Sequence, residues 1–209
     1  MPRVARHLPF IVGCAPLGLL VWDAVTGGLG ANPINQVIRS TGFWALVCLA
    51  IALASAPMGR ILRWEGALVW RRTFGLMAFL YAFLHTAAYV GLDQVLSIAD
   101  IATDVARRPH ITVGLLSFVL LVPLALTSFG GLAERLGERR WHGIHQLVYP
   151  AAALGVVHHL LIAKVDTGAP FVFAVIFTGL FAIRMWYLLP RQDRRRRERF
   201  DQTPHVPGR

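Results

Sequence analysis

Four histidines lie in long apolar stretches where charged side chains are otherwise scarce: His85, His145, His158 and His159. Ionisable residues are costly inside a bilayer, so their presence there indicates a function. The middles of the same stretches contain no aspartate or glutamate, which argues against a proton relay built from carboxylates. Zinc sites need three or four ligands close together, whereas neutral imidazoles are usual axial ligands of haem iron. This set favours haem; buried histidines bonded to backbone carbonyls, and proton or ion transport, remain alternatives.

The spacing along two stretches predicts sites at two depths. His85 follows Arg71 by 14 residues, and His158 follows His145 by 13. These intervals span about 21 Å and about 20 Å along a helix that rises 1.5 Å per residue. With both helices running outward from the cytoplasm, His85 and His158 share an outer level, and Arg71 and His145 share an inner level. Two sites at two depths suggest a route across the membrane.

The helical register does not decide which histidine of the adjacent pair His158 and His159 belongs to the outer site. Around an ideal helix, residues 14 apart are separated by about 40° and residues 13 apart by about 140°. An ideal helix therefore brings His159, rather than His158, to the face of His145. A broad binding face or a bend in the helix would accommodate His158 instead, so spacing alone does not choose between them.

The composition identifies the elements that hold these side chains as membrane helices. Of the 209 residues, 56% are hydrophobic and 15% are charged, and the net charge is +10. Soluble domains carry about 25% charged residues, and disorder requires low hydrophobicity. Two cysteines are too few for a disulfide scaffold or a cysteine-ligated metal site. Each of six apolar stretches is close to the ~20 residues that cross a bilayer. These stretches predict an all-α integral membrane protein, a six-transmembrane-helix bundle. They are Leu8–Val25, Thr41–Ala56, Thr73–Leu92, Ile111–Phe129, His145–Ala163 and Pro170–Leu189.

The arginines predict the orientation of this bundle. Most of them precede the first stretch, lie between the second and third or the fourth and fifth, or follow the sixth. Positively charged loops stay in the cytoplasm, so both termini are expected there. Arg194–Arg197 is expected to anchor the topology and attract anionic headgroups, not nucleic acid. We divide the chain into a transmembrane domain, 1–190, and a basic cytoplasmic tail, 191–209.

Several short motifs together resemble one known family, although none is specific alone. The chain resembles the MsrQ (formerly YedZ) family over nearly its whole length up to the sixth stretch. These are haem-binding membrane subunits of the bacterial periplasmic methionine sulfoxide reductase system, and they belong to the ferric-reductase-like membrane domains, as NADPH oxidases do. The matching motifs are Gly28-Leu-Gly-Ala-Asn-Pro33, Thr41-Gly42, Arg71-Arg72-x-x-Gly75-Leu76, Leu84-His85, Arg108-Pro109, Thr112-x-Gly114, Thr127-Ser128, Ile144-His145-Gln-Leu-Val-Tyr149 and His158.

The resemblance implies specific site residues in a ferric-reductase-like haem-binding domain over 1–190. His85, His145 and His158 match the family's histidines. The 13-residue step has a precedent in the oxidase relatives, so the resemblance favours His158 over His159. It makes His85 and His158 the axial ligands of haem b.

At the inner level, the resemblance leaves two interpretations. Arg71 stands where the oxidase relatives have a second histidine on the same helix. Either His145 is a ligand of a second haem, with Arg71 pairing a propionate, or the site holds FMN, with Arg71 or Arg72 meeting its phosphate. We expect one haem b plus FMN.

The implied function is electron transfer in the bacterial inner membrane. Electrons from the quinone pool, or from a cytoplasmic flavin reductase, would pass through FMN and haem b to a periplasmic molybdopterin-dependent methionine sulfoxide reductase that repairs oxidised proteins. The chain is then a redox subunit without the catalytic site for the final substrate, and any nucleotide-binding domain is expected on another chain. The alternative is a stand-alone quinol-dependent ferric or oxygen reductase.

Two outer connections complete the sequence predictions. Residues Gly27–Thr41 are expected to form a loop in which Asn32-Pro33 makes a turn; this loop is either a simple connection or a docking or flavin-contact surface. Residues Gly91–His110 are expected to carry a short helix.

Overall fold

The computed structural model describes residues 3–128, 132–163 and 168–201. The regular elements in these residues are all helical, and no strand occurs among them. Along the chain they are α1 (Arg3–Thr26), α2 (Pro33–Ile61), α3 (Ala67–Ala88), the short π-helix η1 (Tyr89–Asp93), α4 (Ile98–Arg107), α5 (Pro109–Ser128), α6 (Leu132–Leu136), α7 (Glu138–His145), α8 (Val148–Ile162) and α9 (Gly168–Asp201).

Within the described residues, five helical segments are long and apolar enough to cross a membrane: His7–Thr26, Pro33–Ile61, Ala67–Asp93, Pro109–Ser128 and Gly168–Tyr187. They correspond to five of the six predicted stretches. The remaining stretch, His145–Ala163, is divided, because α7 ends at His145 and α8 begins at Val148. With 15 residues, α8 alone is shorter than the ~20 residues that a crossing needs.

The connection between α1 and α2 differs from the prediction. Instead of a loop over Gly27–Thr41, the chain enters α2 at Pro33. Asn32 caps this helix, since its side-chain oxygen accepts a hydrogen bond from the backbone N–H of Asn35 at 3.1 Å. Proline suits the first helical position, where no intrahelical N–H bond is lost. The Asn32-Pro33 pair therefore starts a helix and does not form the expected turn.

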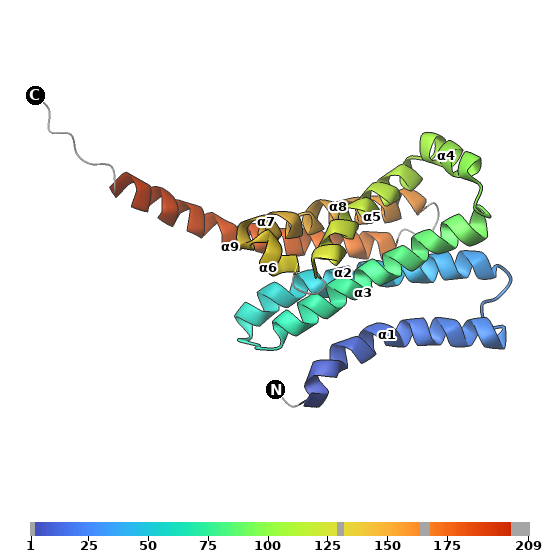
Figure 1. The fold of residues 1–209 in the computed structure, drawn as a ribbon, viewed down its shortest axis with the longest axis horizontal. Helices are drawn as coiled ribbons and strands as arrows, with labels where there is room; N and C mark the ends of the chain where they lie inside the picture. The colour runs from blue at the N-terminus through green and yellow to red at the C-terminus, as the bar shows by residue number, and fades with distance from the viewer. Residues whose placement is uncertain (1–2, 129–131, 164–167, 202–209) are drawn as a thin grey trace, which may run out of the picture.

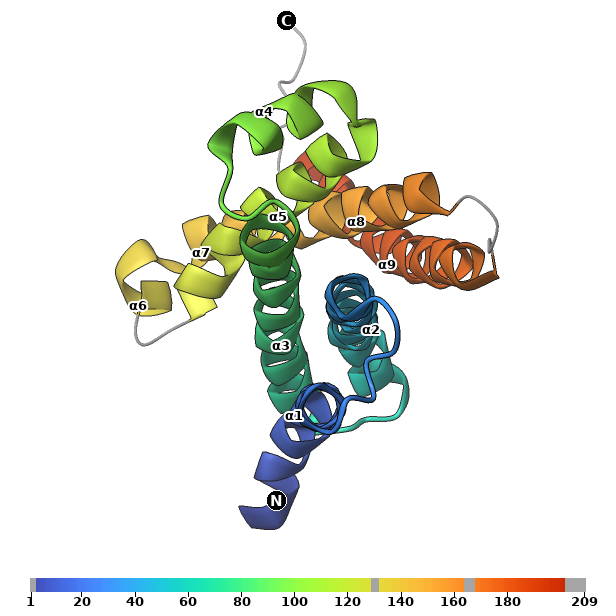
Figure 2. The ribbon, with the colours of Figure 1, turned by 90° about the vertical axis from the view of Figure 1, so that its right-hand side faces the viewer.

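Two helix pairs form the centre of the bundle. α2 packs along α3, and α5 packs along α8 (Figure 2). Ala78, Ala151 and Ala152 are 1% exposed or less, and such small residues let membrane helices approach closely. α1 lies outside these pairs and is fastened to α3 by the hydroxyl of Tyr81, which donates to the carbonyl of Gly13 at 2.8 Å.

The two ends of the bundle differ (Figure 1). The α2–α3 turn and α6 lie at one end, toward which both termini point, and α4 lies at the other. α4 confirms the short helix expected in Gly91–His110. Asp104 fastens it in place, because its carboxylate accepts a hydrogen bond from the Tyr89 hydroxyl at 2.9 Å and pairs with the Arg108 guanidinium at 3.1 Å. α9 runs on past the bundle to Asp201.

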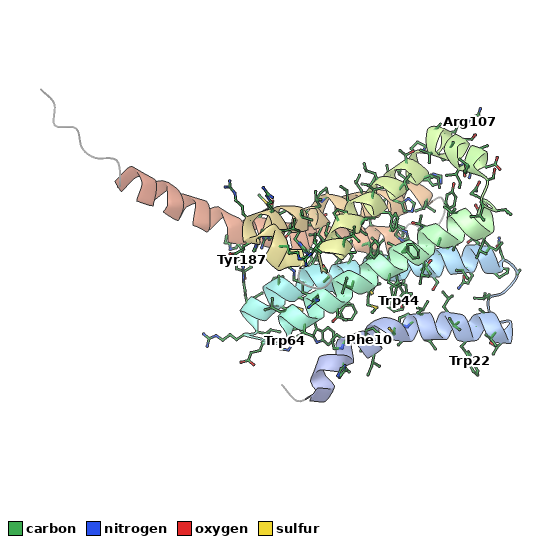
Figure 3. All side chains as sticks on the ribbon, in the orientation of Figure 1. Phe10, Trp22, Trp44, Trp64, Arg107 and Tyr187 are labelled. Carbon is green, nitrogen blue, oxygen red and sulfur yellow. The ribbon has the colours of Figure 1, made fainter. Side chains whose placement is uncertain are left out.

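Aromatic side chains mark both ends of the bundle. Trp22 and Trp64 lie near opposite ends, with Trp44 between them (Figure 3). Trp22 is 67% exposed, and tryptophan favours the boundary between hydrocarbon and headgroups. The bundle therefore has the length and edge composition of a membrane domain.

Candidate functional site

The structure brings His85 and His158 together. They lie on α3 and α8, 73 residues apart in sequence, yet their ring centroids are 5.9 Å apart, with the ring planes inclined at 83°. The two rings are therefore neighbours, although they come from different helices. This is the pair for which the sequence predicted a shared outer level.

A backbone carbonyl on a neighbouring helix holds each of these rings. The Nδ1 atom of His85 lies 2.8 Å from the carbonyl oxygen of Ile38 on α2. The Nδ1 atom of His158 lies 2.6 Å from the carbonyl oxygen of His110 on α5. A carbonyl oxygen only accepts hydrogen bonds, so each Nδ1 carries the hydrogen and each Nε2 keeps its lone pair. Metal-binding histidines in proteins are held in this tautomer by such bonds.

This geometry fits an iron ion shared by the two rings. Metal–imidazole bonds of about 2 Å on each side account for about 4 Å of the 5.9 Å between centroids, and the half-widths of the rings account for the rest. Among the described residues, no hydrogen bond is made to Nε2 of either His85 or His158. Two imidazoles held in this way on separate helices are the kind of donor set that a bis-histidine haem requires.

His159 points away from this pair. Its ring lies 5.7 Å from the ring of Phe173 on α9, and its buried Nε2 has no hydrogen-bond partner among the described residues. The ideal-helix argument that favoured His159 does not apply, because the helix is interrupted between His145 and Val148. Gln146 and Leu147, between these helices, keep helical φ and ψ, but i→i+3 hydrogen bonds form here, so the winding departs from that of an ideal α-helix.

The predicted inner residues line a cavity of about 360 Å³. Arg71 and Arg72 come from α3, His145 and Trp141 from α7, and Ser128 from the end of α5. Most of the remaining wall is apolar and is supplied by α2, α3, α5 and α8: Leu49, Ala52, Leu53, Leu68, Gly75, Leu76, Phe79, Leu121, Leu124, Ala125, Thr127 and Val148.

His145 is held by its own short helix. Its ring stacks on that of Trp141, with centroids 4.0 Å apart, and its Nδ1 lies 3.1 Å from the Trp141 carbonyl oxygen. Its Nε2 lies 3.5 Å from the Ser128 hydroxyl, which already donates to the carbonyl of Leu124 at 2.7 Å. Nε2 therefore keeps a lone pair for another donor or a metal. The buried indole N–H of Trp141 has no acceptor among the described residues.

The two arginines at this cavity differ in their partners. The Arg72 guanidinium donates to the carbonyl of Ser128 at 3.0 Å. For Arg71, the described part of the chain provides no hydrogen bond or ion pair. The described residues that line the cavity include two arginines and no carboxylate, so this part of its lining is positively charged. Two guanidinium groups and an unpaired indole N–H are suited to a ligand with an anionic group and hydrogen-bond acceptors.

Comparison with known proteins identifies the family. The family model "Ferric reductase like transmembrane component" matches residues 41–156. A Rhodospirillum rubrum relative, named protein-methionine-sulfoxide reductase heme-binding subunit MsrQ, is 44% identical over 197 residues, which cover 93% of this chain and 92% of the relative. The chain belongs to the MsrQ family. MsrQ relatives from Caulobacter vibrioides (43% identical, 82% of each chain) and Deinococcus radiodurans (42% identical, 83% of this chain and 85% of the relative) agree.

Side-chain patterns in this MsrQ-family chain could not reveal all of the site. The carbonyls of Ile38 and His110 belong to the main chain, so no residue type predicts their role. No sequence signal assigned Trp141 to the site, yet its ring stacks on His145, its side chain lines the cavity and its buried N–H has no partner among the described residues. The motifs Thr41-Gly42 and Thr112-x-Gly114 lie beside the two carbonyls and were the available signal.

Proposed function

We propose that this chain is a haem-binding electron-transfer subunit, with His85 and His158 as the axial ligands of haem b. The observation that carries the proposal is the pair of neighbouring imidazoles, with centroids 5.9 Å apart, each bonded through Nδ1 to a carbonyl of another helix. Bound haem supplies one-electron transfer at this place. The protein's part is to hold both rings in the ligating tautomer and to surround them with apolar helices.

The proposed topology has six crossings, with both termini in the cytoplasm of a bacterial cell and the bundle in the inner membrane. α8 rises about 22 Å at 1.5 Å per residue, and α7 supplies the rest of the fifth crossing. Both termini point to one end of the bundle, as an even number of crossings requires. The transmembrane domain is 1–190 and the basic tail is 191–209. Arginine-rich segments on that side support the cytoplasmic assignment.

We propose that the inner cavity holds the second redox cofactor, FMN, with its phosphate at Arg71 and Arg72. Those guanidinium groups, the unpaired Trp141 N–H and the apolar walls support a planar ligand that has an anionic tail. A second haem with His145 as a ligand is the alternative. It is weaker, because the position 14 residues before His85 is an arginine, so α3 offers no second imidazole at this level.

The proposed route carries electrons from the quinone pool, or from a cytoplasmic flavin reductase, across the inner and then the outer level. The relatives are named as haem-binding subunits of a protein-methionine-sulfoxide reductase, and the acceptor that we propose is a periplasmic, molybdopterin-dependent reductase of this kind. Methionine sulfoxide is a reversible lesion, so its repair requires only reductant. The chain itself then needs no site for the oxidised substrate.

The match to ferric-reductase-like domains supports one other function, a stand-alone quinol-dependent ferric or oxygen reductase. It predicts that the purified protein reduces a ferric chelate or oxygen when given quinol and no partner. An electron-transfer subunit requires the soluble acceptor for turnover, so the same assay with and without the partner separates the two functions.

Purified full-length protein tests the haem assignment. We expect a low-spin haem b spectrum on reduction, together with flavin in the acid extract. His85→Ala and His158→Ala should each abolish the low-spin spectrum, and His142→Ala, which changes an exposed imidazole, should retain it. Retention of the spectrum in both ligand variants would remove the assignment.

A further inference from the structure

Two helix pairs repeat one arrangement around the outer histidines. In α2 and α3, the His85 ring bonds the carbonyl of Ile38 and lies against Gly42. In α5 and α8, the His158 ring bonds the carbonyl of His110 and lies against Gly114. In each pair, the glycine follows the accepting residue by four positions, one helical turn, and so lies on the same helix face.

Neither glycine leaves room for a side chain. A Cβ atom at residue 42 would lie 2.9 Å from Nδ1 and 3.1 Å from Cε1 of His85. At residue 114 it would lie 2.6 Å from Nδ1 and 2.7 Å from Cε1 of His158. Real Cβ atoms do not approach other heavy atoms this closely, so an alanine at either position would displace the ring.

The missing Cβ, and not backbone freedom, explains glycine at these two positions. Both residues are inside regular helices, and neither has a positive φ. Glycine is unfavourable in helix interiors, so it needs another reason there. By contrast, a Cβ at Gly18, Gly75 or Gly179, also in helices, would meet nothing within 4 Å.

We propose that Gly42 and Gly114 are positioning residues that set the orientation of the two iron-binding imidazoles. Because each glycine lacks a Cβ, the histidine ring fits between two helices and bonds the carbonyl one turn before the glycine. A Cβ would push the ring off that carbonyl, free its Nδ1–H and displace its Nε2. The iron-binding part of this inference rests on the proposed function; the steric part does not.

The first test uses full-length Gly42→Ala and Gly114→Ala, with Gly179→Ala as the matched control. Nearly perpendicular imidazole planes, 83° apart here, give a strongly anisotropic low-spin ferric signal in electron paramagnetic resonance. We expect the largest g value and the midpoint potential to shift in both variants and to stay unchanged in the control. Haem retention should fall about tenfold or more, the range found when partners that orient metal ligands are removed. Gly114→Ala should have the larger effect, because its contact is the closer one.

The second test removes the ring with which the new methyl group would collide. In a His158→Ala background, Gly114→Ala should lower neither the melting temperature nor the yield of monodisperse protein, and Gly42→Ala should behave in the same way in His85→Ala. Equal losses with and without the histidine would mean that these glycines serve helix packing generally, which overturns the inference. This comparison remains informative if the single glycine variants fail to fold.

The two proposals fail in different ways. Wild-type protein without haem, or haem that survives both histidine replacements, would remove the proposed function and leave the steric result standing. Haem that depends on both histidines, but whose g values and potential are unchanged in both glycine variants, would overturn the positioning role alone.

Discussion

The outer and inner levels of the bundle hold their histidines differently. At the outer level, α2 and α5 fix the rings of His85 and His158 through main-chain carbonyls, so each imidazole is oriented by tertiary packing. At the inner level, His145 bonds a carbonyl of its own helix, four residues back, and stacks on Trp141 beside a cavity of about 360 Å³. The outer level is preorganised for one rigid donor pair, whereas the inner level offers space, positive charge and unpaired polar groups.

The largest expected effect is the loss of haem when an outer histidine, but not the inner one, is replaced. His158→Ala should abolish the low-spin haem spectrum, because it removes a proposed axial ligand of the outer pair. His145→Ala should leave that haem in place and reduce the ligand of the inner cavity. Haem and flavin quantified in the same samples measure the contrast. Loss of the outer haem spectrum in His145→Ala would break it.

A bulky side chain in the inner cavity should exclude flavin without affecting the outer haem. Gly75 lines the cavity, and a Cβ there would meet nothing within 4 Å, so Gly75→Phe places a ring in the open space. We expect the flavin content to fall to near zero while the low-spin haem spectrum stays at its wild-type intensity. Gly179→Phe, at an open position on α9, is the control for a new phenylalanine. Wild-type flavin content in Gly75→Phe would place the flavin elsewhere.

Neutralising the cavity arginines should weaken the binding of an anionic ligand. Hydrogen bonds to charged groups contribute about 1.5–3 kcal/mol, so Arg71→Gln should lower FMN affinity by roughly tenfold or more. Arg72→Gln should also destabilise the fold slightly, because Arg72 bonds the carbonyl of Ser128. Flavin titration and thermal melting measure the two effects. Equal FMN affinity in wild type and Arg71→Gln would argue against a phosphate at Arg71.

The smallest expected effect comes from the loss of a single hydrogen-bond donor. Trp141→Phe keeps an aromatic ring beside His145 and removes the buried indole N–H that lacks an acceptor. Ligand affinity should fall several-fold, by about 1 kcal/mol, the usual contribution of one hydrogen bond. Ligand-free protein should melt at the same or a higher temperature, since an unsatisfied donor is gone. A lower affinity together with a lower melting temperature would indicate a packing defect instead.

Most of the fold could be predicted because membrane helices leave a strong signal in one dimension. Apolar length placed five of the six predicted stretches on long helices. The division near Gln146 was not predicted, because hydropathy does not register a local change from i→i+4 to i→i+3 hydrogen bonds. The start of α2 was missed for a similar reason: Asn32-Pro33 suits both a turn and a helix start, and the position of Asn35 decides between them.

Residue types and spacing by themselves predicted histidines at two depths as the candidate functional feature, because intramembrane imidazoles are rare and a helix has a fixed rise per residue. Only the packing of α2, α3, α5 and α8 decided which ring lies beside His85. The same packing decided which carbonyls bond the two rings and which glycines leave room for them. The axial rise of a helix is the same for each residue, so the depth of a residue follows from counting along the sequence. Close contact between helices depends on their relative rotation, which a short change in helical winding is enough to alter.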